Sequence, residues 1–228
     1  MSASAESLRA RSAIFERLRA ATRDPQNTPL DVSAALLPLL ADPAGETRTQ
    51  RYIRHARSWR AEVIETTQVD WPEALQALLR ARAPRQLFAG PGSEIAATLA
   101  DCVPPQQLRW FDREIAALKP ELFATDAGIT TTLGGLAASG SLLVMPTIAE
   151  PRTLSLVPPL HIALLHESQL QDSLLSAMWH YGWASAMPSN LLTITGPSKT
   201  ADIQRMLVYG AHGPRELVIL LVQDGVRS

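Results

Sequence analysis

A short turn late in the chain, Gly196-Pro-Ser-Lys-Thr200, carries the residue types that bind anions. The hydroxyl groups of Ser198 and Thr200 and the ammonium group of Lys199 can hold a phosphate or a carboxylate. A helix that begins here would add free amide hydrogens and partial positive charge at its N-terminus. The structural alternative is that Ser198 or Thr200 caps this helix, that Asp202 complements its dipole and that Lys199 is solvated. Spacing alone leaves both alternatives open.

Two histidines and Asp202 are the candidates for proton transfer. His161 opens an apolar run after Pro158-Pro159-Leu160, and His212 lies in the turn Gly210-Ala-His-Gly-Pro214. Because imidazole changes its charge near neutral pH, either histidine could act as acid or base. The structural alternatives are a hydrogen-bonded core residue for His161 and a partner of a helix C-terminus for His212.

Other motifs in the chain are weak or absent. Gly90-Pro-Gly92-Ser-Glu-Ile95 follows an apolar run, and Asp112 lies about 20 residues further on, as in a dinucleotide-binding loop, but isoleucine replaces the third glycine. His166-Glu167 lacks the second histidine of a zinc protease motif, and neither the P-loop glycines nor Gly-x-Ser-x-Gly are present. The single cysteine, Cys102, excludes an intramolecular disulfide and a multi-cysteine metal site, and we expect it to be a small buried or loop residue. The sequence therefore predicts no metal and no cofactor.

The elements that must position these residues begin with a helical region. Apolar residues at helical spacing predict helices over residues 4–22 and 46–67 and a third helix that begins at Asp70. Four prolines in residues 23–45 predict a linker that crosses the surface. We therefore assign residues 1–83 to an N-terminal helical extension.

From Pro84 onward the pattern alternates between strands and helices. The expected strands cover residues 86–89, 108–111, 127–130, 141–145, 161–165, 191–195 and 217–222. The expected helices cover residues 94–100, 113–118, 168–179 and a segment from Ile203 to the terminating Gly210. Apolar strands that alternate with helices predict an α/β fold, with a largely parallel sheet and helices on both faces, over residues 84–228.

Composition restricts the class of protein. The chain has 228 residues, of which 46% are hydrophobic and 19% charged, and its formal net charge is −1. Such values are ordinary for a globular protein, and no basic surplus indicates nucleic acid or an anionic membrane as a partner. No apolar run approaches the ~20 residues of a membrane-spanning helix, and the N-terminus lacks the apolar core of a secretory signal. We expect a cytoplasmic protein.

Several stretches resemble the signature of the lactate utilization protein C family, which carries the LUD domain. Gly196-Pro-Ser-Lys-Thr-Ala-Asp-Ile203 and Tyr209-Gly-Ala-His-Gly-Pro214 resemble the family's Gly-Pro-Ser-Arg/Lys-Thr-Ala-Asp-Ile-Glu and Gly-Val-His-Gly-Pro. The run from Arg152 to Ile162 resembles its Ser-Leu-x-Pro-x-His-Ile segment, and residues 128–130 and 140–144 resemble its glycine-rich block. These motifs are long and occur in the family's order.

The resemblance, over roughly residues 85–222, has implications for both fold and function. It implies a Rossmann-like fold similar to that of ribose-5-phosphate isomerase, glucosamine-6-phosphate deaminase and the CoA-transferases. It also implies a role in the oxidation of L-lactate to pyruvate beside two iron–sulfur partner proteins. The family protein itself has no cluster cysteines, in agreement with the single Cys102. With the resemblance, the candidate anion-binding residues are Gly140, Ser141, Gly196, Ser198, Lys199, Thr200 and Gly213.

This chain departs from the family pattern where many members carry an acid. It reads Ala137-Ala138-Ser139-Gly140-Ser141, so the carboxylate expected near Ala138 is missing, and Leu133 stands where some members have another acid. The loss removes the obvious general base or nucleophile.

Three functions remain open on these grounds. We favour an accessory subunit that binds a small anion or an iron–sulfur partner. The main alternative is an enzyme of the isomerase and CoA-transferase group that acts on a phosphate- or carboxylate-bearing substrate, with His161, Asp202 or His212 moving protons. A nicotinamide-dependent dehydrogenase is the third. Neither nucleic acid nor a membrane is an expected partner, and the oligomeric state is open.

Overall fold

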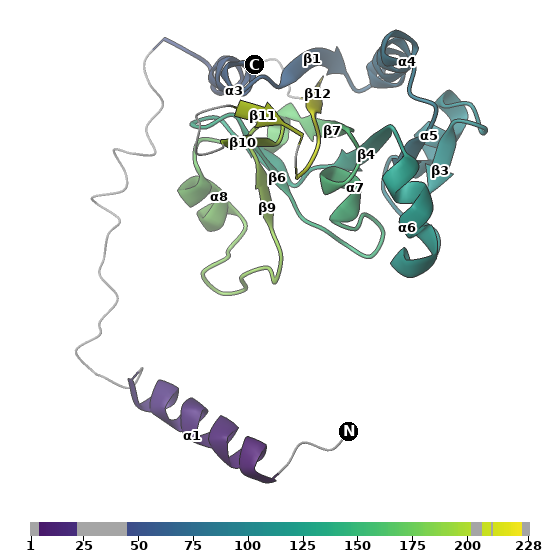
Figure 1. Cartoon of the computed structure of the whole chain (residues 1–228). Coiled ribbons are helices and arrows are strands. Elements are labelled where there is room, and N and C mark those ends of the chain that lie inside the picture. Colours follow the sequence, from purple (N-terminus) through teal and green to yellow (C-terminus); the bar gives the residue numbers. More distant parts are fainter. Residues whose placement is uncertain (1–4, 22–44, 202–206, 211, 225–228) are drawn as a thin grey trace. The chain divides into compact units, whose positions relative to one another are not determined.

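The protein consists of two compact units. The computed structural model describes residues 5–21, 45–201, 207–210 and 212–224. The units are residues 1–41 and residues 42–228, and Figure 1 shows the whole chain. The linker predicted over residues 23–45 lies outside the described residues, except for its last residue.

The first unit contains helix α1 (Ala5–Ala21), which confirms the helix predicted at the start of the chain. Its apolar side chains Ile14, Phe15 and Leu18 are exposed. The guanidinium group of Arg11 lies 5.6 Å from the centroid of the Phe15 ring, a stabilising cation–π arrangement. Neither α1 nor any other helix in the described part of the chain is both long and apolar enough to cross a membrane.

A six-stranded sheet forms the centre of the second unit. Its strands lie in the order β1 (Glu62–Thr67), β12 (Glu216–Gln223), β7 (Leu160–His166), β4 (Ala127–Thr131), β2 (Leu87–Ala89) and β3 (Leu108–Trp110). Every neighbouring pair is parallel. The interior strand β12 is apolar and buried from Leu217 to Val222, as expected for a strand that is covered on both faces. The predicted α/β fold with a largely parallel sheet is confirmed.

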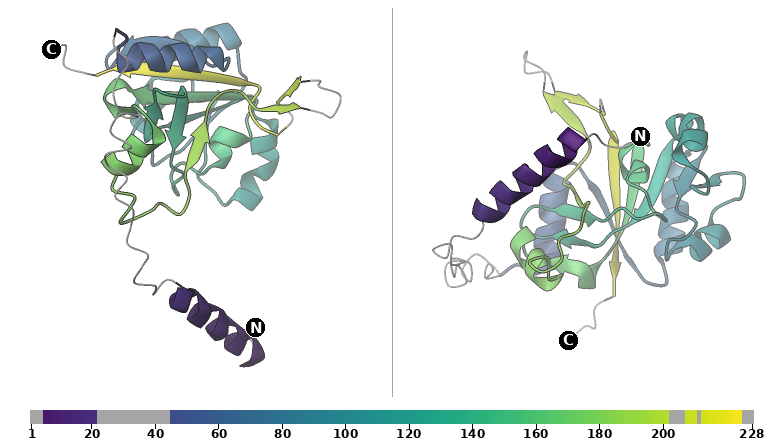
Figure 2. Two further views of the ribbon diagram at one scale, coloured as in Figure 1. Left: turned by 90° about the vertical axis from the view of Figure 1, so that its left-hand side faces the viewer. Right: turned by 90° about the horizontal axis from the view of Figure 1, so that it is seen from below.

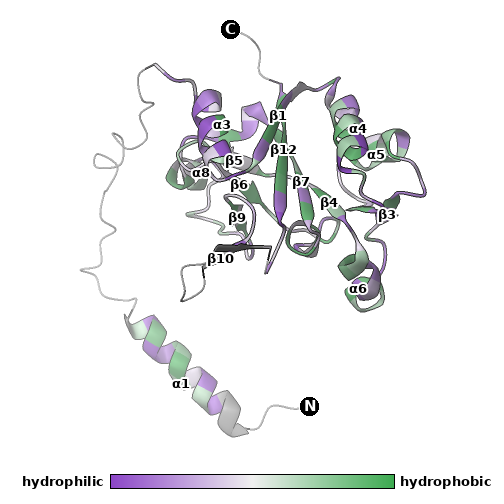
Figure 3. Cartoon of the chain, turned by 45° about the horizontal axis from the view of Figure 1, so that its top comes forward, coloured by the Kyte–Doolittle hydropathy of each residue, from purple (hydrophilic) through white to green (hydrophobic). Residues whose placement is uncertain are grey.

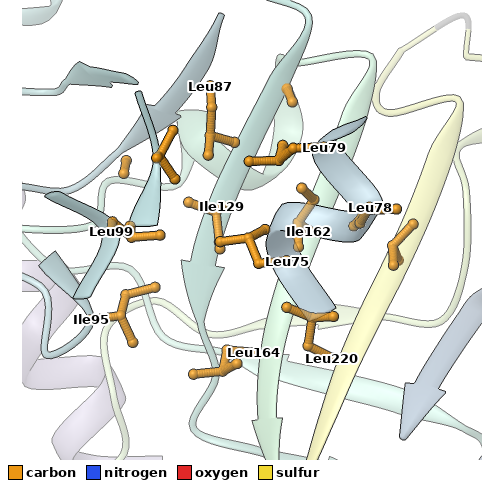
Figure 4. Close-up of a cluster of buried hydrophobic side chains, with 14 of the residues drawn as sticks. Leu75, Leu78, Leu79, Leu87, Ile95, Leu99, Ile129, Ile162, Leu164 and Leu220 are labelled. Carbon is orange, nitrogen blue, oxygen red and sulfur yellow. The ribbon is translucent and has the colours of Figure 1, made fainter. Parts of the chain in front are cut away.

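Helices cover both faces of this sheet (Figure 3). On one face lie α4 (Trp71–Arg82) and α5 (Ala96–Cys102), and on the other lie α3 (Arg48–Ser58), α6 (Ile115–Ala124) and α7 (Thr153–Leu156). Figure 4 shows Leu75 of α4 packed against Ile129 and Ile162 of the sheet. Because successive strand residues point to opposite faces, Ala163 and Leu165 pack on the α3 side.

A smaller sheet shares the core on the α3 side. Its four strands lie in the order β8 (Leu170–Gln171), β5 (Gly134–Leu136), β6 (Ser141–Val144) and β9 (Leu192–Ile194). Two further strands, β10 (Lys199–Ala201) and β11 (Leu207–Tyr209), form an antiparallel pair (Figure 2). The strands predicted over residues 141–145 and 191–195 therefore exist, but they belong to this second sheet.

The helix predicted over residues 168–179 is wrong in its first half. The 3₁₀ turn η1 (Glu167–Gln169) and β8 come first, and helix α8 (Leu174–His180) follows. The N-cap is Ser173, whose side chain accepts a hydrogen bond from the amide of Ser176. A serine cap was expected, but it lies five residues later.

The helix predicted over residues 46–67 is wrong in its second half. Helix α3 ends at Ser58, Arg60 adopts a φ of 66°, and β1 follows. Val63 in β1 is buried and lies opposite Ile219 of β12. Local periodicity could not detect this strand because its partner lies at the other end of the chain. The sheet therefore includes residues that precede the boundary expected at residue 83.

Candidate functional site

The turn that was expected to bind an anion does not begin a helix at its described positions. After β9, residues 196–198 lead into β10, where Lys199 pairs with Tyr209 of β11. The helix predicted up to Gly210 is therefore wrong at its C-terminal end, while residues 202–206, including Asp202, lie outside the described residues. Apolar spacing over so short a run does not distinguish a helix from a strand.

Gly196 and Lys199 instead meet Trp59, the C-cap residue of α3. A Cβ atom on Gly196 would lie 2.4 Å from the carbonyl oxygen of Trp59, so only glycine permits this approach. The ammonium nitrogen of Lys199 lies 4.9 Å from the centroid of the Trp59 ring. The aromatic face and the negative end of the helix dipole both stabilise a cation here.

Gly140 packs against the same end of α3, and Ser141 follows it in β6. Gly140 has a φ of +70°, and a Cβ atom there would lie 2.2 Å from the backbone nitrogen of Ala56. The Ser141 hydroxyl lies 2.9 Å from the hydroxyl of Thr195, and the Ser139 hydroxyl lies 2.8 Å from that of Ser141. Two motifs that are far apart in sequence thus converge on one helix end.

The convergence forms an open pocket of about 480 Å³, which we call the signature pocket. Its lining residues are Ser58, Trp59, Arg60, Thr195, Gly196, Pro197 and Lys199. Two of them are cationic and two carry hydroxyl groups, and none of the described lining residues is acidic. This combination is suited to an anion.

Ser198 and Gly213 lie close together at the base of the β10–β11 pair. The amide of Ser198 donates to the carbonyl oxygen of Pro214 at 2.8 Å, and the amide of Gly210 donates to the carbonyl oxygen of Ser198 at 2.8 Å. A Cβ atom on Gly213 would lie 3.1 Å from the Cβ of Ser198. These contacts hold the base of the β10–β11 pair, and Thr200 lies within β10.

The two candidate histidines have opposite environments. His161 is fully buried, its Nε2 lies 2.9 Å from the Thr130 hydroxyl, and burial lowers its pKa to about 4. His212 is exposed in the turn before β12. A neutral, enclosed His161 fits the structural alternative of a hydrogen-bonded core residue, because it has no exposed surface to offer to a ligand.

A second cleft lies at the carboxyl edge of the central sheet. From β2 the chain passes through α5 to β3 on one side, and then through α6 to β4 on the other side of β2. Because α5 and α6 cover opposite faces, β2 and β4 flank a topological switch point, where open α/β sheets bind ligands. A cleft of about 270 Å³ opens there. This switch-point cleft is lined chiefly by Ser93, Glu94, Thr131, Thr132, Glu150 and Gln169.

Glu150 is the buried charge of this cleft, with 9% of its surface exposed. Its carboxylate accepts hydrogen bonds from the amide of Thr131, at 3.1 Å, and from the Thr131 hydroxyl. Burial raises the pKa of Glu150, and the charge of Glu94 adds to this effect, while the Thr131 donors oppose it. A carboxyl group with a raised pKa exchanges protons closer to neutral pH than an exposed one.

The sequence alone did not identify Glu150. A Cβ atom on Gly90 would lie 2.0 Å from the carbonyl oxygen of Ala149, so this glycine makes room for the loop that carries Glu150. Gly90, the first glycine of the weak dinucleotide-binding motif, therefore accommodates the protein's own backbone. Asp112, the acid of that weak motif, is exposed and pairs with Arg113 at 3.2 Å. A glycine turn directly after a strand was the available signal, but its partner lay about 60 residues away.

Comparison with known proteins agrees with the sequence motifs. The family model described as the LUD domain matches residues 49–222. An uncharacterized protein of Neisseria meningitidis serogroup B is 36% identical over 182 residues, which cover 77% of each chain. Lactate utilization protein C of Shouchella clausii is 31% identical over 123 residues, 53% of this chain and 54% of the relative. Lactate utilization protein C of Bacillus subtilis is 33% identical over 103 residues, 43% of each chain. The match to these two named relatives thus spans about half of their length.

A solved structure shares the fold. The crystal structure of a DUF162 family protein from Deinococcus radiodurans superposes with a TM-score of 0.57 and covers 78% of this chain and 99% of its own. At 17% sequence identity, this similarity concerns the fold alone.

Proposed function

The chain belongs to the LUD domain family, and from this premise we propose that it is an accessory component of an L-lactate oxidation system that binds a small anion in its signature pocket. The name shared by several relatives, lactate utilization protein C, supports this role. In this proposal iron–sulfur partner proteins carry the electrons. A chain whose single cysteine is Cys102 cannot supply the four thiolates of a cluster.

The charge of the signature pocket is the observation that carries the proposal. Lys199 and Arg60 bring two positive charges to a pocket that also contains the Thr195 hydroxyl, while the Ser58 hydroxyl donates its proton to the carbonyl oxygen of His55. None of the described residues that line it has an acidic side chain. The ring of Trp59 beneath the Lys199 ammonium group supports it in position.

An enzyme of the ribose-5-phosphate isomerase and CoA-transferase-like group is the second candidate, and Glu150 is the observation that favours it. The acid missing near Ala138 had argued against acid–base or covalent chemistry. Glu150 brings a buried carboxylate to the edge of the sheet where ligands bind in such folds. Turnover of a substrate that is abolished by Glu150→Gln would favour this candidate over the accessory role.

Growth and binding experiments test the proposed role. Deletion of the gene should prevent growth on L-lactate as sole carbon source, and the tagged protein from lactate-grown cells should copurify with iron–sulfur proteins. In calorimetric titrations with L-lactate, pyruvate and inorganic phosphate, Lys199→Ala should weaken binding of the preferred anion by about tenfold, the value of a hydrogen bond to a charged group. Lys119→Ala removes an exposed lysine of α6 and should bind like the wild type.

The outcomes separate the two parts of the proposal. Normal growth of the deletion strain without copurification would contradict the role in lactate oxidation. Anion binding that is the same in wild type and Lys199→Ala would contradict the assignment of the pocket.

A further inference from the structure

Three of the four hydroxyl groups that line the switch-point cleft donate their protons within the protein, while the fourth, that of Thr147, accepts from the amide of Glu150. The Ser93 hydroxyl donates to the carbonyl oxygen of Gly90 at 2.9 Å, and the Thr132 hydroxyl donates to that of Leu164 at 2.9 Å. The Thr131 hydroxyl donates to Glu150. A hydroxyl group has one proton and two lone pairs, so these three can offer a ligand only acceptors.

Two further side chains of the cleft also present acceptors. The Oε1 atom of Gln169 is buried and has no hydrogen-bond partner among the described residues. An unpaired buried acceptor costs free energy, which a donor on a ligand would recover. The carboxylate of Glu150 has about four lone-pair sites, and the amide and hydroxyl of Thr131 leave part of this capacity unused.

The charge of the cleft points to the same kind of ligand. Glu94 and Glu150 are both acidic, and none of the described lining residues is basic. Carboxylates and phosphates are therefore repelled here, whereas a cation is attracted, most strongly beside the desolvated Glu150.

The position of Glu150 is held rigidly on both sides. The amide of Glu150 donates to the Thr147 hydroxyl at 2.9 Å, and the amide of Thr147 donates to the carbonyl oxygen of Glu150 at 3.0 Å. Ala149 packs against Gly90, and the carboxylate is tied to the end of β4 through Thr131. A carboxylate held in place before a ligand arrives loses little side-chain freedom on binding.

We propose that the switch-point cleft binds a small ligand that carries a protonated amino group, with Glu150 as its counter-ion and Gln169 as a second acceptor. The cleft volume of about 270 Å³ restricts the ligand to a small molecule. This site is separate from the signature pocket in charge and in residues, and it does not depend on the role in lactate oxidation.

Three probes with the same four-carbon chain test this assignment. They are 1,4-diaminobutane, 1,4-butanediol and succinate, which carry two ammonium, two hydroxyl and two carboxylate groups. In titrations of the full chain followed by NMR, the diamine should shift the amide resonance of Thr131, which donates to Glu150. The diol should bind at least about tenfold more weakly than the diamine, because it lacks the charge. Succinate should leave the Thr131 resonance unchanged.

Matched Glu→Gln variants locate the binding. Glu150→Gln keeps the shape but removes the charge, and should weaken diamine binding by about tenfold or more, while Glu94→Gln should weaken it less. Glu121→Gln removes an exposed carboxylate of α6, outside the cleft, and should bind like the wild type. If Glu150→Gln does not fold, the test of the site rests on two measurements. They are the shift of the Thr131 resonance in the wild type and the diamine affinity of Glu94→Gln.

Three results would overturn the proposal. One is an unchanged Thr131 resonance at saturating diamine, and another is equal diamine affinity in wild type, Glu150→Gln and Glu94→Gln. The third is displacement of the diamine by Mg²⁺ or Ca²⁺ bound through Glu150, which would assign the cleft to a metal ion.

Discussion

The signature pocket and the switch-point cleft differ in charge and in origin. The signature pocket is cationic, through Lys199 and Arg60, and forms where family motifs meet the end of α3. The switch-point cleft is anionic, through Glu94 and Glu150, and forms where loops after separate strands converge. Motifs in the sequence indicated the first, whereas only the strand order located the second. Residues that form a recognisable motif are therefore not the only ones that build a pocket in this fold.

The two regions nevertheless share one structural device. Each depends on a glycine that admits backbone from another segment, namely Gly140 against α3 and Gly90 against the loop that carries Glu150. The backbone angles of the two glycines differ. Gly140 has a φ of +70°, in the left-handed region, whereas Gly90 has no positive φ. Substitutions at these glycines therefore test the two regions separately.

The largest effect is expected for Gly140→Ala. The left-handed backbone and the contact of 2.2 Å with Ala56 should together lower the free energy of unfolding by about 3 kcal/mol. Gly182→Ala is the matched control, because Gly182 has a φ of +65° but no atom lies within 4 Å of the position that an added methyl group would take. It should cost only about 1 kcal/mol. Urea unfolding measures both, and equal losses would show that packing against α3 contributes little.

A smaller loss of stability is expected for Gly90→Ala. The new methyl group would collide with the carbonyl oxygen of Ala149, so overpacking should cost about 2 kcal/mol and displace Glu150 from Thr131. Gly92→Ala is the control, because its methyl group would lie 3.1 Å from the Cβ of Ala149, where a small shift suffices. Thermal unfolding should detect the difference between the two variants, and diamine titration should compare Gly90→Ala with the wild type, because Gly92 itself lines the cleft. If the Gly90→Ala protein retained diamine binding, the packing of the loop at Ala149 against Gly90 would not be required for that binding.

The smallest effect is a pH dependence at Glu150. Its pKa in the folded protein lies above the ordinary value of 4.5, because burial and Glu94 disfavour the charged form. Its contribution to stability is therefore present below pH 4.5 and is lost as the pH rises through the folded pKa. The free energy of unfolding of Glu150→Gln minus that of the wild type should therefore increase as the pH rises from about 4.5 to 8. Urea unfolding across this range measures the gain, Glu121→Gln provides the baseline, and a constant difference would contradict a raised pKa.

Much of the fold followed from local patterns in the sequence. The apolar run Leu217–Val222 predicted a strand buried on both faces, and apolar residues at helical spacing predicted a helix that begins at Asp70, which the structure shows as α4. Both predictions are confirmed. They succeed because buried positions are apolar and recur in the sequence with the period of the helix or strand. The family motifs also identified Gly196 and Lys199, which line the signature pocket.

Other features depended on pairing between distant segments. The strand β1 was mistaken for the end of a helix because Val63 fits helical spacing, and only pairing with β12 makes it a strand. The strand β11 was mistaken for the end of a helix and β10 for the turn before it, because only their pairing with each other makes them strands. His161 and Lys199 were grouped as site residues, but the fold buries one in the sheet and leaves the other at a pocket.

The sequence by itself determined the α/β class, the apolar strands and the family motifs, because each of these is written in the order and spacing of neighbouring residues. Only the tertiary structure decided which strands pair, which of the motif residues line a pocket, and that Glu150 stands at the switch point. Strand order depends on contacts between residues that are far apart in the chain, and so does the desolvation that raises the pKa of Glu150. No local pattern carries that information.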